Sequence, residues 1–238
     1  MTRDVCIRSW TGALVLALAG LAAPWARAQS FCSSDRQVQP ARLVERFINA
    51  DCESCWADAS AAAEPDELAL DWIVPGDKGE DAPLSAAATR EALDRLASLN
   101  FAVPAASIAV RRRVEAPKRG LRVSHGVPFN DYIGASIELK SPGSERWSAW
   151  LLLVETIPAG ADGTPIERNL VRNALQLSWQ AAAAASAQRL TRLFESRPMG
   201  IPAGVRPERL RVVGWVQDGR GRIRAITQSR CAPPTPGG

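Results

Sequence analysis

Residues 41–64 read ARLVERFINADCESCWADASAAAE, and this stretch decides the predicted fold. Residues 41–49 form a short run rich in apolar side chains, which is typical of a strand entering a sheet. Cys52 and Cys55 follow at the spacing Cys-x-x-Cys, and helix-forming residues continue from there. Because Pro65 cannot supply a helical N–H and disfavours helix at its predecessor, the sequence predicts a short helix over residues 52–64.

Two further elements are predicted after this helix. Glu67–Val74 (ELALDWIV) alternates, with its apolar residues on one face, as in a strand. Residues 85–99 place Ala92 and Leu96 at helical spacing, and Asn100 is a suitable C-terminal stop. The predicted order is therefore strand, Cys-x-x-Cys helix, strand, helix.

The rest of the chain reads mainly as strands joined by turns. A hairpin is predicted from residues 107–114 and 121–124, joined by a loop that contains proline and glycine. An alanine-rich segment, residues 181–195, reads as helix, and the tail 233–238 reads as disordered. The later strands are predicted over residues 133–140, 147–157, 167–179, 211–217 and 222–228, the last two as a hairpin.

Residues 1–28 have the layout of a signal peptide, with a short basic segment, an apolar run and the ending Ala26-Arg27-Ala28. About twelve apolar residues at ~1.5 Å each reach roughly 18 Å, less than the ~30 Å of a membrane core. No later stretch reaches 18 uninterrupted apolar residues. We therefore expect cleavage after Ala28, no membrane span, and a periplasmic or secreted protein.

Cleavage leaves four cysteines, Cys32, Cys52, Cys55 and Cys231, and an even number in an oxidising compartment favours pairing. Three connectivities are possible. The natural partition pairs Cys52 with Cys55 and Cys32 with Cys231. The second bridge would close a loop of about 200 residues, for which loop-closure entropy predicts a stabilisation of ~5 kcal/mol. We expect that bridge to be structural.

Charge and histidine content exclude several classes of function. Three of the 29 basic and one of the 25 acidic residues lie in residues 1–28, which leaves a net charge of +2, too small to predict nucleic-acid binding. The single histidine, His125, excludes sites that need two imidazoles and is expected at the surface or in a loop. No cofactor is predicted. The basic cluster Arg111, Arg112, Arg113, Lys118, Arg119 and Arg122 could meet an anionic partner or simply be solvated.

The Cys-x-x-Cys pair is the motif with chemistry. At a helix entrance Cys52 would be the nucleophile and Cys55 the resolving thiol, since unsatisfied N–H groups there favour a thiolate. Asp51 and Glu53 disfavour that thiolate, so the couple should lean towards a reductant. Asp71 lies in an otherwise apolar strand; it is either a buried proton acceptor for Cys55 or a solvent-facing side chain.

Residues 44–55, VERFINADCESC, with Ala57 and Asp58 after them, resemble the signature V-E-L-F-T-S-Q-G-C-S-S-C-P-P-A-D of an uncharacterised family of exported bacterial thioredoxin-like proteins. Trp56 stands where that family has proline, and Asp51 where it has glycine. Similar segments follow in the same order over residues 68–74, 90–99, 101–104, 150–155, 167–172 and 212–225.

The resemblance implies an α/β fold, with a thioredoxin-like domain over residues 29–125 that carries the Cys-x-x-Cys pair. A β-rich, sandwich-like domain over residues 126–232 would follow. Thioredoxin-like folds also place a cis-proline against the disulfide, and by order Pro104 is the first choice and Pro128 the second.

Two functional hypotheses follow. In the first, the protein is a thiol–disulfide oxidoreductase that acts through Cys52 and Cys55 on a protein thiol or disulfide partner. In the second, it is a non-catalytic binding or assembly protein, and the pair is a structural disulfide. Zinc or copper carriage by the pair is less favoured, because no histidine or second Cys-x-x-Cys accompanies it. The sequence does not indicate an oligomeric state.

Overall fold

A computed structural model of the chain describes residues 32–143, 146–179 and 192–231. The predicted signal peptide and the predicted tail, residues 233–238, lie outside the described residues. So do residues 181–191, the larger part of the predicted alanine-rich helix.

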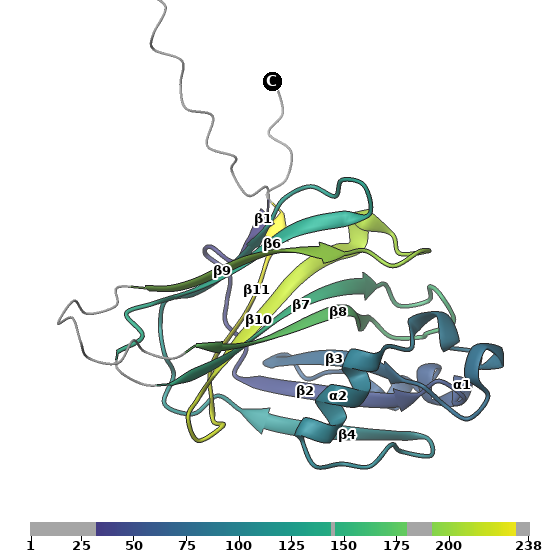
Figure 1. The fold of residues 1–238 in the computed structure, drawn as a ribbon. Coiled ribbons are helices and arrows are strands. Elements are labelled where there is room, and N and C mark those ends of the chain that lie inside the picture. Colours follow the sequence, from purple (N-terminus) through teal and green to yellow (C-terminus); the bar gives the residue numbers. More distant parts are fainter. Residues whose placement is uncertain (1–31, 144–145, 180–191, 232–238) are drawn as a thin grey trace, which may run out of the picture.

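The described part is built mainly of strands, with two short α-helices (Figure 1). Four 3-10 turns lie at Ala59–Ala61, Gly79–Asp81, Ser85–Ala87 and Pro207–Arg209. In chain order the other elements are β1 Cys32–Ser33, β2 Arg42–Asn49, α1 Glu53–Trp56, β3 Glu67–Val74, α2 Arg90–Ser98, β4 Ser107–Arg113, β5 Leu121–His125, β6 Tyr132–Lys140, β7 Trp147–Ile157, β8 Arg168–Trp179, β9 Arg192–Gly200, β10 Leu210–Asp218, β11 Ile223–Gln228 and β12 Arg230–Cys231.

The strands form two sheets, and the smaller lies across part of the larger (Figure 1). The five-stranded sheet has the order β12-β1-β5-β6-β9, and the seven-stranded sheet has the order β11-β10-β7-β8-β3-β2-β4. β2 pairs with β3 in parallel, and β3 joins β8 in parallel through Asp71 and Leu170. The larger sheet thus combines strands from before and after residue 125.

β7 shows why the centre of the larger sheet is buried on both faces. Leu151 and Leu153 belong to the apolar cluster shared with β5 and β6, whereas Leu152 and Val154 belong to the cluster shared with α2. Alternate residues of a strand face opposite sides, so one face packs on the smaller sheet and the other on the helix. At Gly214 of β10 the sheets approach closely, because a Cβ there would lie 2.6 Å from a methyl carbon of Val123.

α2 is fixed over the larger sheet by an ion pair and by aromatic contacts. The Arg95 guanidinium donates to both carboxylate oxygens of the buried Glu45 at 2.7 Å. The same group lies 4.5 Å from the ring centroid of Trp150. Thr89 accepts from the N–H of Ala92 and so caps the helix N-terminus.

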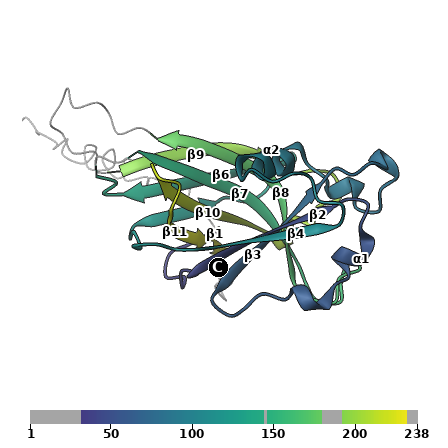
Figure 2. The same cartoon turned by 90° about the horizontal axis from the view of Figure 1, so that it is seen from below.

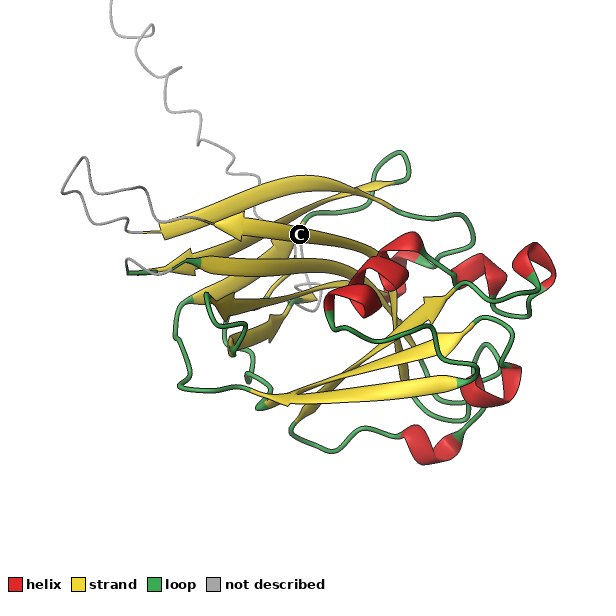
Figure 3. Cartoon of the chain, turned by 60° about the horizontal axis from the view of Figure 1, so that its bottom comes forward, coloured by secondary structure: helices red, strands yellow, loops and turns green. Residues whose placement is uncertain are grey.

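The predicted α/β, thioredoxin-like fold class is wrong. Strands in two packed sheets are the main regular structure of the described chain, and the helix at the cysteines has only four residues. The alanine-rich run after Trp56 carries no large apolar stripe, so it cannot cover a sheet face and gives way to a 3-10 turn. Figure 3 shows the helical turns gathered at one end of the molecule, while strands make up the other end of the described chain.

Two local predictions also fail. β4 and β5 belong to different sheets and do not form the predicted hairpin. The linker between them instead runs along β11, where the backbone N–H groups of Glu115 and Lys118 donate to the carbonyls of Ile223 and Arg224. The end of the predicted alanine-rich helix, from Arg192, is part of strand β9. Other predictions are confirmed: strands β2 and β3 and the β10–β11 hairpin. The helix predicted over residues 85–99 is confirmed from Arg90, as α2, with its stop at Asn100, which has φ of 62°, while Ser85–Ala87 form a separate 3-10 turn.

Candidate functional site

The Cys52–Cys55 disulfide lies at the entrance to α1. Cys52 is the residue before the helix, and Cys55 lies in its single turn. Both cysteines are half-buried, so the bridge is not enclosed by the core. Both pairings predicted from the sequence, Cys52 with Cys55 and Cys32 with Cys231, are confirmed.

The chain before the cysteines is held by Asn49. Its amide nitrogen donates to the carbonyl of Pro104 at 3.0 Å, and its amide oxygen accepts from the N–H of Asp51 at 2.9 Å. The carboxylate of Asp51 accepts from the N–H of Asp77 at 2.9 Å. A Cβ at Gly76 would overlap the side-chain oxygens of both Asn49 and Asp51, so this approach requires glycine.

No peptide bond in the described residues is cis, so both Pro104 and Pro128 are trans. Neither position therefore has the cis-proline that the resemblance implies. Pro104 nevertheless lies at the end of β2, because its carbonyl accepts from the side chain of Asn49, three residues before Cys52.

Trp56 anchors the end of α1 to the loop between β7 and β8. Its ring is buried in a cluster with Ile48, Ile73 and Ile157, and its Nε1 donates to the carbonyl of Asp162 at 2.8 Å. This ring is the only side chain of α1 that is fully buried. It therefore fixes the helix, and with it the disulfide, against residues of β2 and β3 in the larger sheet. Figure 2 shows α1 at the end of the molecule where β2 ends.

Arg168, the first residue of β8, ties the same helix to the sheet. Its Nη2 donates to the carbonyl of Trp56 at 2.7 Å. The same nitrogen donates to the carbonyls of Asp58 at 3.1 Å and Cys55 at 3.2 Å. A one-turn helix leaves these carbonyls without intrahelical partners, so Arg168 caps it. Its Nη1 lies 3.2 Å from Oδ1 of Asp71.

Asp71 is completely buried, so the solvent-facing alternative is wrong. Its Oδ2 accepts from Nη2 of Arg46 at 2.7 Å and from the N–H of Asn169 at 3.1 Å. Arg46 and Asp71 are register partners in the parallel pair β2–β3, which places opposite charges side by side. The described contacts connect Asp71 to Cys55 through Arg168.

A cavity of about 170 Å³ opens beside Cys55. Its wall combines β2, β4, β8 and the Cys-x-x-Cys turn. The residues that matter for its chemistry are Arg46, Cys55, Asp58, Arg111 and Arg168. We call it the Cys55 cavity.

Positive charge predominates around the Cys55 cavity. Arg46 and Arg168 share a single buried counter-ion, Asp71. Arg111 adds a third positive charge, with a side chain that is 64% exposed. The carboxylate of Asp58 is engaged by the hydroxyl and N–H of Ser60, which hold its pKa below its usual value. Arg111 pairs with Glu67 at 4.0 Å, so each of the three arginines has a carboxylate partner. Neither Asp71 nor Glu67 lines the cavity, however, and three of its four charged lining residues are arginines. Positive charge at the wall favours an anionic group there.

The helix stabilises a Cys52 thiolate less than the sequence predicts, because a single helical turn has only a small dipole. The hydroxyl of Ser54 lies 3.6 Å from Sγ of Cys52. The Asp51 carboxylate accepts a hydrogen bond from the N–H of Asp77, in the loop after β3. Glu53 is exposed to solvent, where its charge is screened.

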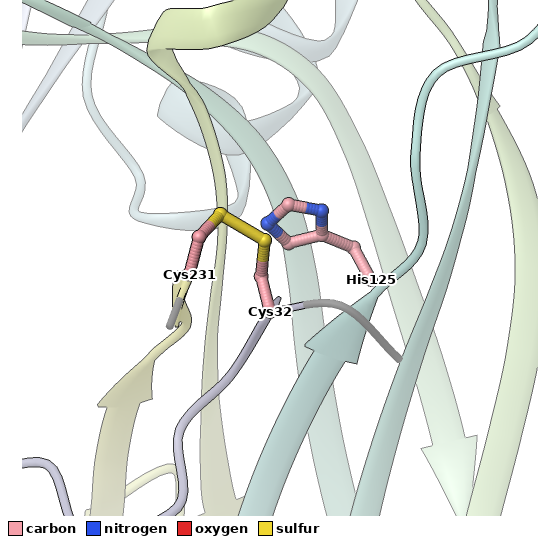
Figure 4. Close-up of side chains that lie close together, drawn as sticks. All are labelled: Cys32, His125 and Cys231. Carbon is pink, nitrogen blue, oxygen red and sulfur yellow. A yellow bond between two sulfur atoms is a disulfide. The ribbon is translucent and has the colours of Figure 1, made fainter. Parts of the chain in front are cut away.

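The second disulfide lies against His125. Cys231, Cys32 and His125 are register neighbours on the adjacent strands β12, β1 and β5. Figure 4 shows the imidazole directed at the bridge. The prediction of a surface or loop histidine is wrong, because His125 is 4% exposed and burial lowers its pKa. Cys231 is exposed, whereas Cys32 is buried.

Sequence reasoning missed the roles of Arg46, Trp56 and Arg168. One signal was available for Arg46, which is a charged residue inside an apolar strand, as Asp71 is in the next strand. Nothing local marks Arg168, which reaches Cys55 from 113 positions along the chain.

Comparison of the sequence with protein-family models and with curated proteins finds no match. Within residues 32–143, 146–179 and 192–231, none of the helices has the length and apolar character that a membrane span requires.

Proposed function

We propose that the protein is an exported thiol–disulfide oxidoreductase that acts through Cys52 and Cys55. The observation that carries the proposal is a half-buried disulfide that borders an open cavity, whose charged lining residues are three arginines and one aspartate. A disulfide that only stapled the chain would need neither the opening nor the charge.

The exchange requires only sulfur chemistry and a protein dithiol. In the reduced protein the Cys52 thiolate attacks one sulfur of a substrate disulfide, and the other substrate sulfur leaves as a thiolate. The Cys55 thiolate then attacks Sγ of Cys52, which closes the Cys52–Cys55 bond and releases the second substrate thiol. Two electrons pass from the pair to the substrate, and a partner dithiol reduces the pair again.

The surroundings suit each cysteine to its step. The hydroxyl of Ser54 can donate to a Cys52 thiolate. Cys55 borders the wall that contains Arg46 and Arg168, and positive charge favours the thiolate that must form there. These guanidiniums are buried, so their charge is screened less than that of the exposed Glu53. Their positive charge therefore makes the pair less reducing than the sequence alone predicts.

The Cys55 cavity suits the substrate side of the exchange. Its volume of about 170 Å³ holds a carboxylate and a few methylene groups rather than a whole ligand. A substrate that carries a carboxylate near its sulfur, such as glutathione disulfide, would bring charge to the cations and sulfur to the cysteines.

The reduction potential of the pair, together with insulin reduction by the reduced protein, tests the proposal. We expect a potential between about −270 and −120 mV, the range of known exchange proteins, and activity that Cys52→Ser abolishes. A potential below about −300 mV with no Cys52-dependent activity would leave the structural-disulfide alternative.

A matched pair of variants on β4 tests the role of the cavity. Arg111 lines the Cys55 cavity, whereas Arg113 is equally a surface arginine of the same strand and does not line it. We expect Arg111→Gln to slow reaction with glutathione disulfide by about threefold to tenfold, and Arg113→Gln to leave the rate unchanged. Equal rates for both variants would show that the cavity does not bind the substrate anion.

A further inference from the structure

We infer that reduction of the Cys32–Cys231 bridge creates a zinc-type metal site with two thiolates and the imidazole of His125 as ligands. The site lies on the smaller sheet and is separate from Cys52 and Cys55. It uses three ligand-bearing residues of the described chain that the exchange reaction leaves unused.

The first argument is topological. Three neighbouring strands each contribute one residue at the same level: Cys231 from β12, Cys32 from β1 and His125 from β5. Residues directly opposite one another on neighbouring strands project to the same face of a sheet. The two sulfurs and a ring nitrogen accordingly all lie within 4.8 Å of one another (Figure 4).

The second argument comes from the protonation of His125. Its Nδ1 lies 2.9 Å from the carbonyl oxygen of Gly126, and a carbonyl can only accept, so Nδ1 carries the hydrogen. A neutral imidazole carries only this one hydrogen on its nitrogens. The lone pair is therefore on Nε2, which is the nitrogen that a metal would use. A histidine ligand typically donates its other N–H to such a carbonyl.

The third argument is that Nε2 has no other use. It is buried and has no hydrogen-bond partner among the described residues. A buried nitrogen without a partner costs free energy, so most are satisfied in folded proteins. Figure 4 shows the ring turned towards the two sulfurs, which are grouped with it as possible metal ligands.

The donor set selects the metal. Two thiolates and one imidazole suit a thiophilic d10 cation, and a tetrahedral zinc ion places them at ~2.3 Å and ~2.0 Å respectively. Such ligands lie roughly 3–4 Å from one another, which the present spacing allows once the S–S bond opens. Because Cys231 is exposed, a water molecule can fill the fourth position.

The bridge must be reduced before it can bind metal. A protein dithiol attacks the exposed sulfur of Cys231, and Cys32 leaves as a thiolate beside His125. The dithiol closes its own disulfide, so two electrons pass to the bridge. Zinc then binds both thiolates, and the protons of the two thiols are released to solvent.

Zinc titration of the full chain in a Cys6→Ser, Cys52→Ser, Cys55→Ser background tests the inference, because this background removes the three cysteines outside the proposed site. After reduction by a phosphine, we expect one equivalent of Zn²⁺ to bind by calorimetry, and none in the oxidised protein. Co²⁺ as a probe should show thiolate charge-transfer bands and the visible bands of a tetrahedral site.

Two variants separate ligation from folding. His125→Ala should weaken zinc binding by at least about tenfold, while circular dichroism of its oxidised form stays unchanged. His125→Cys restores a third ligand and should recover binding with stronger charge-transfer bands. Equal affinity in His125→Ala, no stoichiometric zinc in the reduced chain, or unfolding on reduction before zinc can bind would each overturn the inference.

Discussion

Replacement of Arg168 by methionine should destabilise the protein more than any surface change of the same kind. Arg168→Met keeps the length of the side chain but removes its charge and donors. The carbonyl of Trp56 loses a 2.7 Å hydrogen bond, and Asp71 loses one of its two arginines. Both groups are buried and cannot turn to water instead.

The size of the effect follows from these contacts. Breaking one partner of a buried ion pair typically costs about 3–5 kcal/mol. Asp71 keeps Arg46 and the N–H of Asn169, which favours the lower part of that range. The three carbonyls at the end of α1 lose their shared donor, which acts in the opposite direction. We expect a loss of about 4 kcal/mol in the free energy of unfolding.

Urea unfolding of the oxidised protein, followed by tryptophan fluorescence, measures this loss. Arg197→Met is the matched control, because Arg197 pairs with Glu195 at the surface of β9 and should cost less than about 1 kcal/mol. Since Arg168 also holds the carbonyl of Cys55, Arg168→Met should speed reduction of the Cys52–Cys55 bond by dithiothreitol. A loss no larger than that of Arg197→Met would refute the reasoning.

Three other perturbations have defined outcomes. Gly76→Ala should displace the chain at Asp51 and change the reduction rate of the neighbouring disulfide, measured by thiol labelling, whereas an unchanged rate would contradict the close packing. Cys32→Ala with Cys231→Ala opens a loop of 199 positions and should lower the free energy of unfolding by up to about 5 kcal/mol in urea; a loss below about 1 kcal/mol would contradict a structural bridge. Burial raises the pKa of Asp218, but the outweighing hydrogen bonds from two arginines of β11 and its turn lower it to about 2, so its stabilisation is complete above pH ~4 and is lost as the pH falls towards 2. Between pH 4 and pH ~2 the melting temperature should fall more steeply for the parent protein than for Asp218→Asn. An equal fall in both proteins would contradict the ion pairs.

The sequence was most informative where structure depends on local periodicity. The alternation in Glu67–Val74 predicts β3 and its apolar face, and Leu68, Leu70 and Trp72 do lie in the cluster under α2. The cysteine pairing was also predicted correctly, because Cys52 and Cys55 are close in the sequence while Cys32 and Cys231 lie near the ends of the described chain.

The fold class depends on contacts that no local pattern reports. β8 enters the larger sheet beside β3 through the pairing of Asp71 with Leu170, nearly a hundred residues apart in the sequence. The linker after β4 resembles a hairpin turn, yet it crosses from one sheet to the other along β11. The run after Trp56 has helix-forming residues but no apolar face, and packing overrides propensity there.

The site was found only in part for the same reason. The spacing of Cys52 and Cys55 identifies them in the sequence. The residues that hydrogen-bond to their helix come from distant elements: Arg168 from β8 and Asp162 from the loop before it. Asp71 drew attention as a charge in an apolar strand, but its partners depend on the register of β2 and β3.

The most direct test of the central claim is the reaction of a single free thiol at the site with glutathione disulfide. In Cys55→Ser, with Cys32–Cys231 intact, Cys52 has no resolving partner, so mass spectrometry should find a stable glutathione adduct on Cys52. Cys52→Ser, which leaves only Cys55 free, should react more slowly. If Cys52 stays unmodified, or if Cys55 reacts faster, Cys52 is not the nucleophile of an exchange reaction and the account is contradicted.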